Sequence, residues 1–467
     1  MAVQLLLAKR ADLTAVGAET STLNLLTGAG LNIEYMDGWQ AAIAAGNPPD
    51  AAPITDVLNL VVTGTTGDVL AAYLQNLDDK VREVQEFWEG AQERGGVWLR
   101  AQLTSETKAR QAFIREAALS LGESIFTPYT DASSVIRKLA LSLVRQPFWE
   151  ATATTTTSAA ALNCLGGTTS GAPMTVAGDV PARVPLISVV CAASMLREWW
   201  LGFRSTRYGT LANFASVWDL GIAGITRDAD TTRVANGEGG FMSQCTFTAV
   251  ATMLTRVTPV ISDITANTSD QRGKFHVLLR AKVSNNTTVC HVQMKDGYDG
   301  ALSWRTQQGY QVIDGAVTTS FFLYPLGTVT IPPTRGLSSA PDFSTFAIGV
   351  NAARVSGAGT LDMDSLVLIP YNEGAIHASA PIPTPGLALD NIYIYTREDE
   401  AIDGHTRAVV TTPPVDSLAI DCQNWGCPVG STMCVFAAQE ETAQVITDSV
   451  TLDISRYHRW RTLRGAD

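Results

Sequence analysis

The stretch from Val57 to Arg94, VLNLVVTGTTGDVLAAYLQNLDDKVREVQEFWEGAQER, contains a strand, a turn and the chain's one clearly amphipathic helix. Its apolar, β-branched start at 57–62 predicts a buried strand, and the run of Thr and Gly after it predicts a turn. Beyond the turn, apolar residues recur at steps of three and four, which predicts a helix of about 26 residues and roughly 40 Å. Thr65 or Thr66 can cap its start, and the glycines after Arg94 end it.

The apolar stripe of this helix is expected to pack against a β-sheet. Its members share a helical spacing: Leu70, Leu74, Leu77, Val81, Val84 and Trp88. Most of the remaining chain consists of short, alternating apolar runs separated by turn residues, which predicts strands, whereas Thr107–Leu121 fits a helix or a strand. The expected fold class is therefore mainly β, with an α+β N-terminal domain that has one long helix and a β-sandwich or jelly-roll second domain.

Composition shifts divide the chain into four expected segments. Residues 1–150 form the β-sheet domain with the helix, and residues 151–160 form a polar, threonine-rich linker. Residues 161–375 form the β-sandwich. Residues 376–467 form an additional β region, which either stands alone or completes an earlier domain.

The charge and the hydropathy pattern argue against nucleic-acid binding and against membrane insertion. The net charge of −12 and the pI near 5.0 argue against nucleic-acid binding through phosphates. No apolar run approaches the length of a membrane-spanning helix, and the N-terminal apolar run is too short for a signal-peptide core. We therefore expect neither nucleic-acid recognition nor membrane insertion.

The seven cysteines are scattered, as is typical of small buried side chains in a reducing compartment. Cys422 and Cys427 are spaced so that they can bridge or share a metal. No second pair or nearby histidine completes a zinc set, so no cofactor is expected.

Candidate catalytic residues are sparse. The histidines lie near no Gly-x-Ser-x-Gly elbow, and His276 and His291 fall within expected strands. Asp362 and Asp364 point to one face of a strand, where they can bind structural calcium, form a glycosidase pair or remain solvated or hydrogen-bonded strand carboxylates. We expect no enzymatic activity.

Two aromatic clusters are candidate binding residues. Trp199, Trp200 and Tyr208 can form a platform that stacks on sugars, although adjacent tryptophans in a strand point to opposite sides, which places one of them in the core. Near the C-terminus, aromatic and arginine residues of the kind enriched in protein interfaces gather in Tyr457, Arg459, Trp460 and Arg461. The alternative for this second cluster is a final strand with a basic edge.

About the first 150 residues have the expected order strand, turn, long helix and further strands, and they end in LSLVRQPFWE (Leu141–Glu150). A second stretch, VAGDVPARVPL (Val176–Leu186), comes after them. Taken together, they resemble the distal tail proteins of long-tailed bacteriophages and related phage-tail-like particles. The resemblance implies that residues 1–150 are a tail-tube-like domain whose copies form a ring, a hexamer in that family. It also implies that the second domain is a galectin-like or carbohydrate-module-like sandwich.

The same resemblance implies the partners and the location. The partners would be the tail tube, the tape-measure protein and the baseplate hub, with a cell-surface glycan as a further contact. The protein would be a structural component of the virion tail that is assembled in the host cytoplasm. Two other functions remain open from the residues alone, a carbohydrate-binding adhesin and a polysaccharide-active enzyme.

Overall fold

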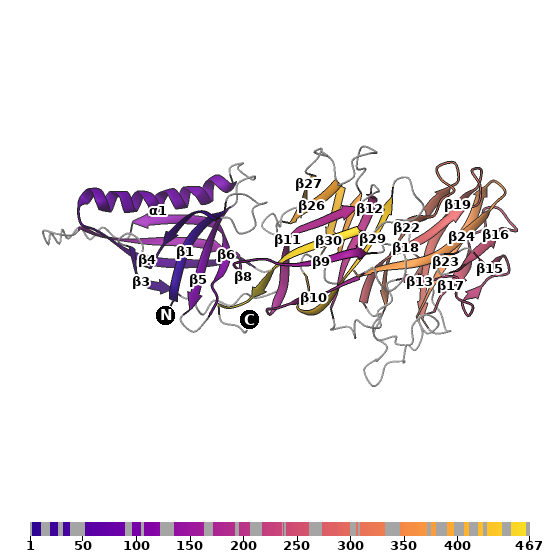
Figure 1. The fold of residues 1–467 in the computed structure, drawn as a ribbon, viewed down its shortest axis with the longest axis horizontal. Helices are drawn as coiled ribbons and strands as arrows, with labels where there is room; N and C mark the ends of the chain where they lie inside the picture. The colour runs from indigo at the N-terminus through magenta and orange to yellow at the C-terminus, as the bar shows by residue number, and fades with distance from the viewer. Residues whose placement is uncertain are drawn as a thin grey trace, which may run out of the picture.

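A computed structural model gives the fold, which is mainly β as the sequence predicts, with one helix among the described residues (Figure 1). The structure describes residues 2–10, 19–26, 31–37, 52–88, 96–103, 107–121, 135–162, 171–191, 196–205, 217–235, 237, 240–260, 273–298, 305–306, 309–331, 346–370, 375–379, 390–396, 406–410, 419–423, 427–440 and 450–463.

The N-terminal domain has two sheets, and the strand β6 (Arg110–Leu121) belongs to both of them. In spatial order its strands are β2 (Glu19–Asn24), β1 (Ala2–Arg10), β5 (Val97–Leu103), β6 (Arg110–Leu121), β7 (Val135–Arg145), β4 (Ile54–Gly64) and β3 (Leu31–Asp37). The first part of β6 pairs with β5 and the remainder with β7, with a register shift between Ile114 and Glu116. The segment that fitted either helix or strand is thus a strand, because both of its edges are paired.

Helix α1 (Gly67–Trp88) lies along this domain (Figure 1). Its N-terminus is capped by Thr66, whose Oγ1 accepts a hydrogen bond from the backbone N of Val69 at 3.3 Å. Gly64 is required just before it, because a Cβ there would lie 2.6 Å from the backbone N of Leu70.

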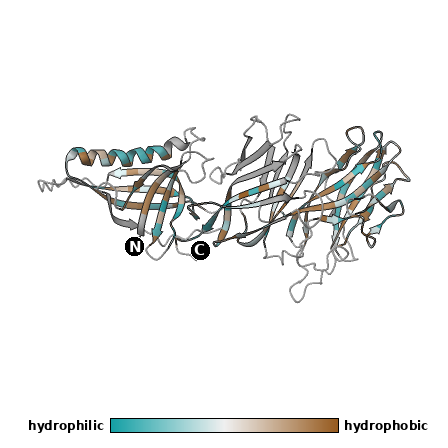
Figure 2. Cartoon of the chain, viewed as in Figure 1, coloured by the Kyte–Doolittle hydropathy of each residue, from teal (hydrophilic) through white to brown (hydrophobic). Residues whose placement is uncertain are grey.

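The predicted stripe of α1 faces the sheets, and apolar and polar residues alternate along the helix (Figure 2). Leu70, Leu77, Val81 and Val84 are buried in one cluster with side chains of β1, β4, β5, β6 and β7. Leu74 packs against the same cluster and is partly buried. The side chain of Trp88 lies outside the described residues.

A middle sandwich follows, built from two segments far apart in the chain. One sheet has the order β9 (Thr155–Leu162), β30 (Val450–Trp460), β11 (Val180–Cys191), β26 (Asp390–Thr396) and β27 (Thr406–Val410). The other has the order β10 (Gly171–Val176), β29 (Gly430–Glu440), β12 (Leu196–Ser205), β25 (Ala375–Ser379) and β28 (Ala419–Gln423).

An outer sandwich is inserted between β12 and β25, at the end of the molecule opposite α1 (Figure 1). Its first sheet has the order β15 (Thr231–Ala235), β16 (Phe241–Thr246), β24 (Thr360–Pro370), β18 (Gly273–Val283) and β22 (Phe322–Ile331), with β13 (Val217–Asp219) also paired to β24. Its second sheet has the order β14 (Thr226–Arg227), β17 (Leu254–Thr258), β23 (Phe346–Ser356), β19 (Val289–Tyr298) and β20 (Arg305–Thr306), with β21 (Gln311–Asp314) also paired to β19.

This topology differs from the expected segments in two ways. Residues 161–375 do not form one sandwich, because β10 to β12 share their sheets with strands from 376–467. The expected linker at 151–160 contains most of β9, which pairs with β30. Threonine is β-branched and therefore fits a pleated strand. For this reason a polar, threonine-rich composition is compatible with an edge strand as well as with a linker.

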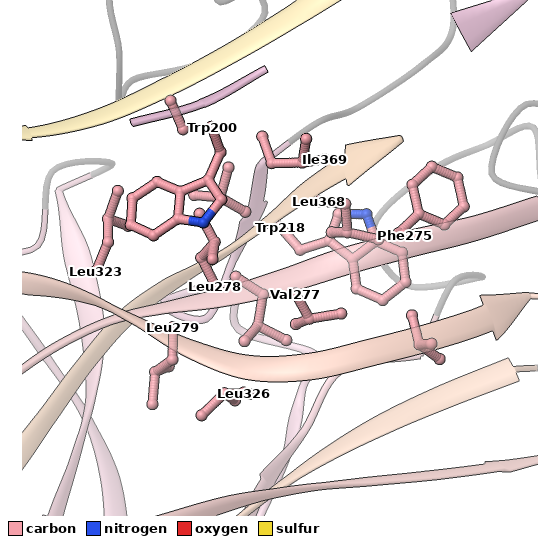
Figure 3. Close-up of a cluster of buried hydrophobic side chains, with 14 of the residues drawn as sticks. Trp200, Trp218, Phe275, Val277, Leu278, Leu279, Leu323, Leu326, Leu368 and Ile369 are labelled. Carbon is pink, nitrogen blue, oxygen red and sulfur yellow. The ribbon is translucent and has the colours of Figure 1, made fainter. Parts of the chain in front are cut away.

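The two sandwiches share one hydrophobic core. Trp200 of β12 lies near Leu323 and Ile369 of the outer sandwich, as Figure 3 shows, and all three are buried in the same cluster. Gly202 is needed at this contact, because a Cβ there would lie 2.2 Å from the carbonyl oxygen of Pro370. The outer sandwich is therefore packed onto the middle one through apolar contact as well as through its two connections.

No helix in the described part of the chain is long and apolar enough to cross a membrane.

Candidate functional site

The candidate functional site is the junction between the N-terminal domain and the middle sandwich. The short strand β8 (Trp149–Ala151) pairs with β6 of the N-terminal domain on one side and with the end of β30 on the other. One hydrogen-bonded path of strands therefore runs from the N-terminal domain into the middle sandwich.

A buried carboxylate lies at the centre of this junction. Glu150 is fully buried and accepts hydrogen bonds from Nε and Nη2 of Arg183 at 2.7 and 2.8 Å. It also accepts from Nε and Nη2 of Arg459 at 3.0 and 2.8 Å. Burial opposes ionisation of Glu150, but Arg183 and Arg459 outweigh burial and hold its pKa at about 2, below the ordinary 4.5. The carboxylate thus links three strands, β8, β11 and β30.

Aromatic rings surround the arginines of the junction. The Arg183 guanidinium lies 4.7 Å from the ring centroid of Tyr457 and 5.3 Å from that of Trp98. Arg110 of β6 lies 3.9 Å from the ring centroid of Trp460 and donates a hydrogen bond from Nη1 to the carbonyl oxygen of Thr462 at 3.0 Å. These contacts join the end of β30 to the N-terminal domain with cation–π and hydrogen-bond geometry.

A second buried ion pair braces the N-terminal domain next to the junction. Nε of Arg145 lies 2.5 Å from Oδ2 of Asp56, and both side chains are essentially inaccessible to solvent. The Arg145 guanidinium lies 4.4 Å from the Trp149 ring, so the pair connects β4 and β7 to β8.

A histidine on the opposite side of β30 holds the middle sandwich together. Nδ1 of His458 accepts a hydrogen bond from the backbone N of Ala177 at 3.1 Å, and Nε2 lies 3.1 Å from Oγ1 of Thr155. Burial, together with the positive charges of Arg456 and Lys108, lowers the pKa of His458. Because Nδ1 accepts, the neutral ring with its proton on Nε2 is the form that fits.

The candidate interface residues near the C-terminus belong to this junction. Tyr457, Arg459 and Trp460 are 1%, 1% and 5% exposed, so the interface that they form lies within the chain. The backbone N of Arg461 donates to Oδ1 of Asp179 at 2.8 Å. Folding of the chain itself covers Tyr457, Arg459 and Trp460.

Of the candidate aromatic platform, the structure describes only the side chain of Trp200. Trp200 is 2% exposed and lies in the shared core, so it cannot stack on a sugar. Tyr208 and the side chain of Trp199 lie outside the described residues.

The paired aspartates of β24 have protein partners. Oδ2 of Asp364 lies 2.6 Å from Nη1 of Arg280, and both side chains are buried. Oδ1 of Asp362 accepts from Nε2 of Gln244 at 2.9 Å and from Oγ1 of Thr360 at 3.1 Å. These contacts are those expected of hydrogen-bonded carboxylates in a strand. In the described part of the chain, no three His, Cys, Asp or Glu side chains gather to hold a metal.

Cys245, Cys290, Cys427 and Cys434 are buried thiols that form no disulfide. Sγ of Cys427 lies 3.3 Å from the sulfur of Met174, so Cys427 is a packing residue and not half of a bridge. The side chain of Cys422 lies outside the described residues. Burial raises the pKa of Cys245 to about 11 and that of Cys290 to about 12, which leaves these thiols protonated and unreactive near neutral pH.

Comparison with known proteins gives only distant likenesses. No protein-family model matches the chain, and no curated protein matches it. Among solved structures, the CBM22-1 xylan-binding domain of Paenibacillus barcinonensis Xyn10C is 10% identical, with a TM-score of 0.22, and covers 33% of this chain and 93% of its own.

Two longer structures also match. The N-terminal CBM22-1–CBM22-2 tandem domain of the same protein is 9% identical, with a TM-score of 0.21, and covers 57% of this chain and 98% of its own. The SPP1 Dit (gp 19.1) protein, described as a hub adsorption apparatus of phages that infect Gram-positive hosts, is 9% identical, with a TM-score of 0.22, and covers 77% of this chain and 98% of its own. Likenesses this distant assign neither a family nor a function.

Sequence reasoning missed the role of Glu150 and Arg183. Both lie in the two stretches that carry the resemblance, but nothing local pairs them, because they are 33 residues apart and Arg459 is 309 residues from Glu150. The one available signal was the arginine-rich composition of the chain from Arg456 onward.

Proposed function

We propose that the chain is a structural, ring-forming subunit of a phage tail tip or baseplate, similar to a distal tail protein and without enzymatic activity. Copies of the N-terminal domain form the ring, and the two sandwiches project from it. The tail tube, the tape-measure protein and the baseplate hub are the partners that this role implies, and the virion tail is its location.

The observation that carries the proposal is the pair of open edges on the N-terminal domain. Among the described strands, β2 pairs only with β1, and β3 pairs only with β4. Open edges present unpaired backbone donors and acceptors, which invite another strand. Because the two edges differ, pairing β2 of one copy with β3 of the next is a head-to-tail contact, and such contacts close into rings when the rotation allows.

The packing of α1 and the sandwiches supports the same arrangement. The helix covers apolar side chains of the N-terminal sheets, while the outer sandwich lies at the far end of the molecule (Figure 1). Edge-to-edge assembly through the N-terminal domain would therefore leave the outer sandwich away from the ring. Asp362 and Asp364, the carboxylates considered for catalysis, are committed to hydrogen bonds and an ion pair, which supports a non-catalytic role.

The proposal is tested by mass photometry and negative-stain electron microscopy of the purified chain. We expect a single closed oligomer with a central hole. A chain that stays monomeric at its highest soluble concentration, alone and with a tail-tube protein, contradicts the proposal.

Two adjacent proline variants in β2, Ser21→Pro and Thr22→Pro, make the test specific. Alternate N–H groups of an edge strand point outward, so one variant breaks the ladder with β1 and the other removes only an outward donor. The variant that keeps the circular dichroism spectrum of the wild type should lose ring formation. If that variant still forms rings, the contact does not use this edge.

A further inference from the structure

The outer sandwich has an exposed aromatic side chain that the ring proposal does not use. Tyr310, just before β21, is 55% exposed, and its ring stacks on His291 of β19 with centroids 3.9 Å apart and planes 18° apart. The stack covers one face of the tyrosine ring and fixes its orientation, and more than half of the residue's surface stays accessible to solvent.

Strand register places polar side chains beside this ring. His291, Gln293 and Lys295 alternate on β19 with Cys290, Val292 and Met294, which are fully buried in the core, so the first three face outward. Opposite them on β23 lie Ala353, Asn351 and Gly349. Asn351 in turn lies opposite Thr255 of β17, whose Oγ1 is 2.8 Å from Oδ1 of Asn351.

The outward face thus combines a fixed aromatic ring with amide and hydroxyl groups. The strand next to β19 contributes Gly349 and Ala353, which have little or no side chain. Pyranose rings with equatorial substituents present one face of C–H groups, which stacks on an aromatic ring, and a rim of hydroxyls, which amides bind. The chemistry of this face matches such a sugar.

Charge selects among sugars. The chain carries a net charge of −12, which repels polyanionic glycans. On the outward face of β19, Lys295 is the one side chain with a permanent charge. Its ammonium group can donate hydrogen bonds to a hydroxyl or carbonyl oxygen as well as to an anion.

We propose that the outward face of the β17–β23–β19–β21 sheet binds a neutral, β-linked polysaccharide chain, with Tyr310 as the stacking platform and Gln293 and Thr255 as hydrogen-bonding partners. This assignment rests on the proposed function in one respect, namely that the outer sandwich faces away from the ring and reaches the host surface. It replaces Trp200 as the glycan contact, because Trp200 is buried.

The test is isothermal titration calorimetry of the full-length protein with xylohexaose, cellohexaose and chitohexaose, and with a heparin hexasaccharide as the polyanionic probe. We expect saturable binding of at least one neutral hexasaccharide. Tyr310→Ala should weaken that binding roughly tenfold, and Tyr310→Phe, which keeps the ring, should stay within about twofold of the wild type. Phe241→Ala, which removes an exposed ring from the other sheet, should bind as the wild type does.

Three outcomes overturn the assignment: no neutral hexasaccharide binds, only the heparin hexasaccharide binds, or Tyr310→Ala binds as tightly as the wild type. Thermal unfolding of each variant checks that the exposed substitution leaves the fold intact. Mass photometry of the same samples separates the two proposals, because Tyr310→Ala should form the same oligomer as the wild type. Rings without glycan binding reject this inference alone, and glycan binding without rings rejects the ring proposal alone.

Discussion

Substitution of Glu150 by glutamine should loosen the junction between the N-terminal domain and the middle sandwich. Glutamine keeps the shape but removes the charge, which leaves the guanidinium groups of Arg183 and Arg459 buried without a carboxylate. The difference between the ordinary pKa of 4.5 and the value of about 2 in the folded chain corresponds to about 3 kcal/mol. Breaking a buried ion pair by removing one partner costs about 3–5 kcal/mol, which agrees in size.

The pH dependence provides the sharper test. Because the folded pKa of Glu150 lies below its unfolded value, its contribution is complete above pH 4.5 and is lost as the pH falls toward 2. The difference in stability between the wild type and Glu150→Gln should therefore shrink through this window. An equal difference at neutral and acid pH would refute the reasoning.

Hydrogen exchange of the amides in β8 and β30 is the appropriate assay, because a chain of several domains need not unfold in one step. Exchange free energies from these two strands report the junction itself. Glu116→Gln is the matched control, since Glu116 lies on the neighbouring strand β6 and is exposed. That variant should leave exchange in β8 and β30 unchanged at every pH.

Three further predictions concern the core and β30. Leu77→Asp should destabilise the N-terminal domain by several kcal/mol and abolish rings in mass photometry, because Leu77 is fully buried, whereas Asn76→Asp on the exposed face should do neither. Acidification below pH 6.5 should lower the exchange free energies of the amides in β30, because the lowered pKa of His458 favours the neutral ring in the fold; His458→Asn, which keeps an acceptor for Ala177, should remove this decrease. Trp200→Ala should cost about 3–5 kcal/mol and speed exchange in β12 and β24 together, and exchange confined to β12 would contradict a shared core.

The parts of the fold that could be predicted are those that local pattern determines. The stripe of α1 and the cap at Thr66 follow from spacing within one stretch, and most strands follow from alternation. The register of the strands and the choice of their partners do not follow from local pattern. The insertion of the outer sandwich between β12 and β25 was therefore not predicted. The polar, repetitive composition of residues 151–160 indicated a linker. Composition does not reveal that most of this stretch belongs to a strand that pairs with β30.

The candidate sites show the same limit. The residues Tyr457 to Arg461 have the composition of an interface, but composition does not distinguish contact with another molecule from contact between two parts of one chain. Adjacent tryptophans predicted that one would be buried, and Trp200 is. Tyr310 was not singled out, because its setting depends on the pairing of β19 with β21 and on the stack with His291.

The placement of β30 has a consequence for synthesis. Chains emerge from the ribosome N-terminus first, and domains fold as they become complete. The strands of the N-terminal domain and of the outer sandwich all precede residue 371, so both can form while translation continues. The middle sandwich cannot close, and Arg459 cannot reach Glu150, until β30 has been made. A nascent chain can thus form its N-terminal domain and its outer sandwich before β30 connects them through the middle sandwich.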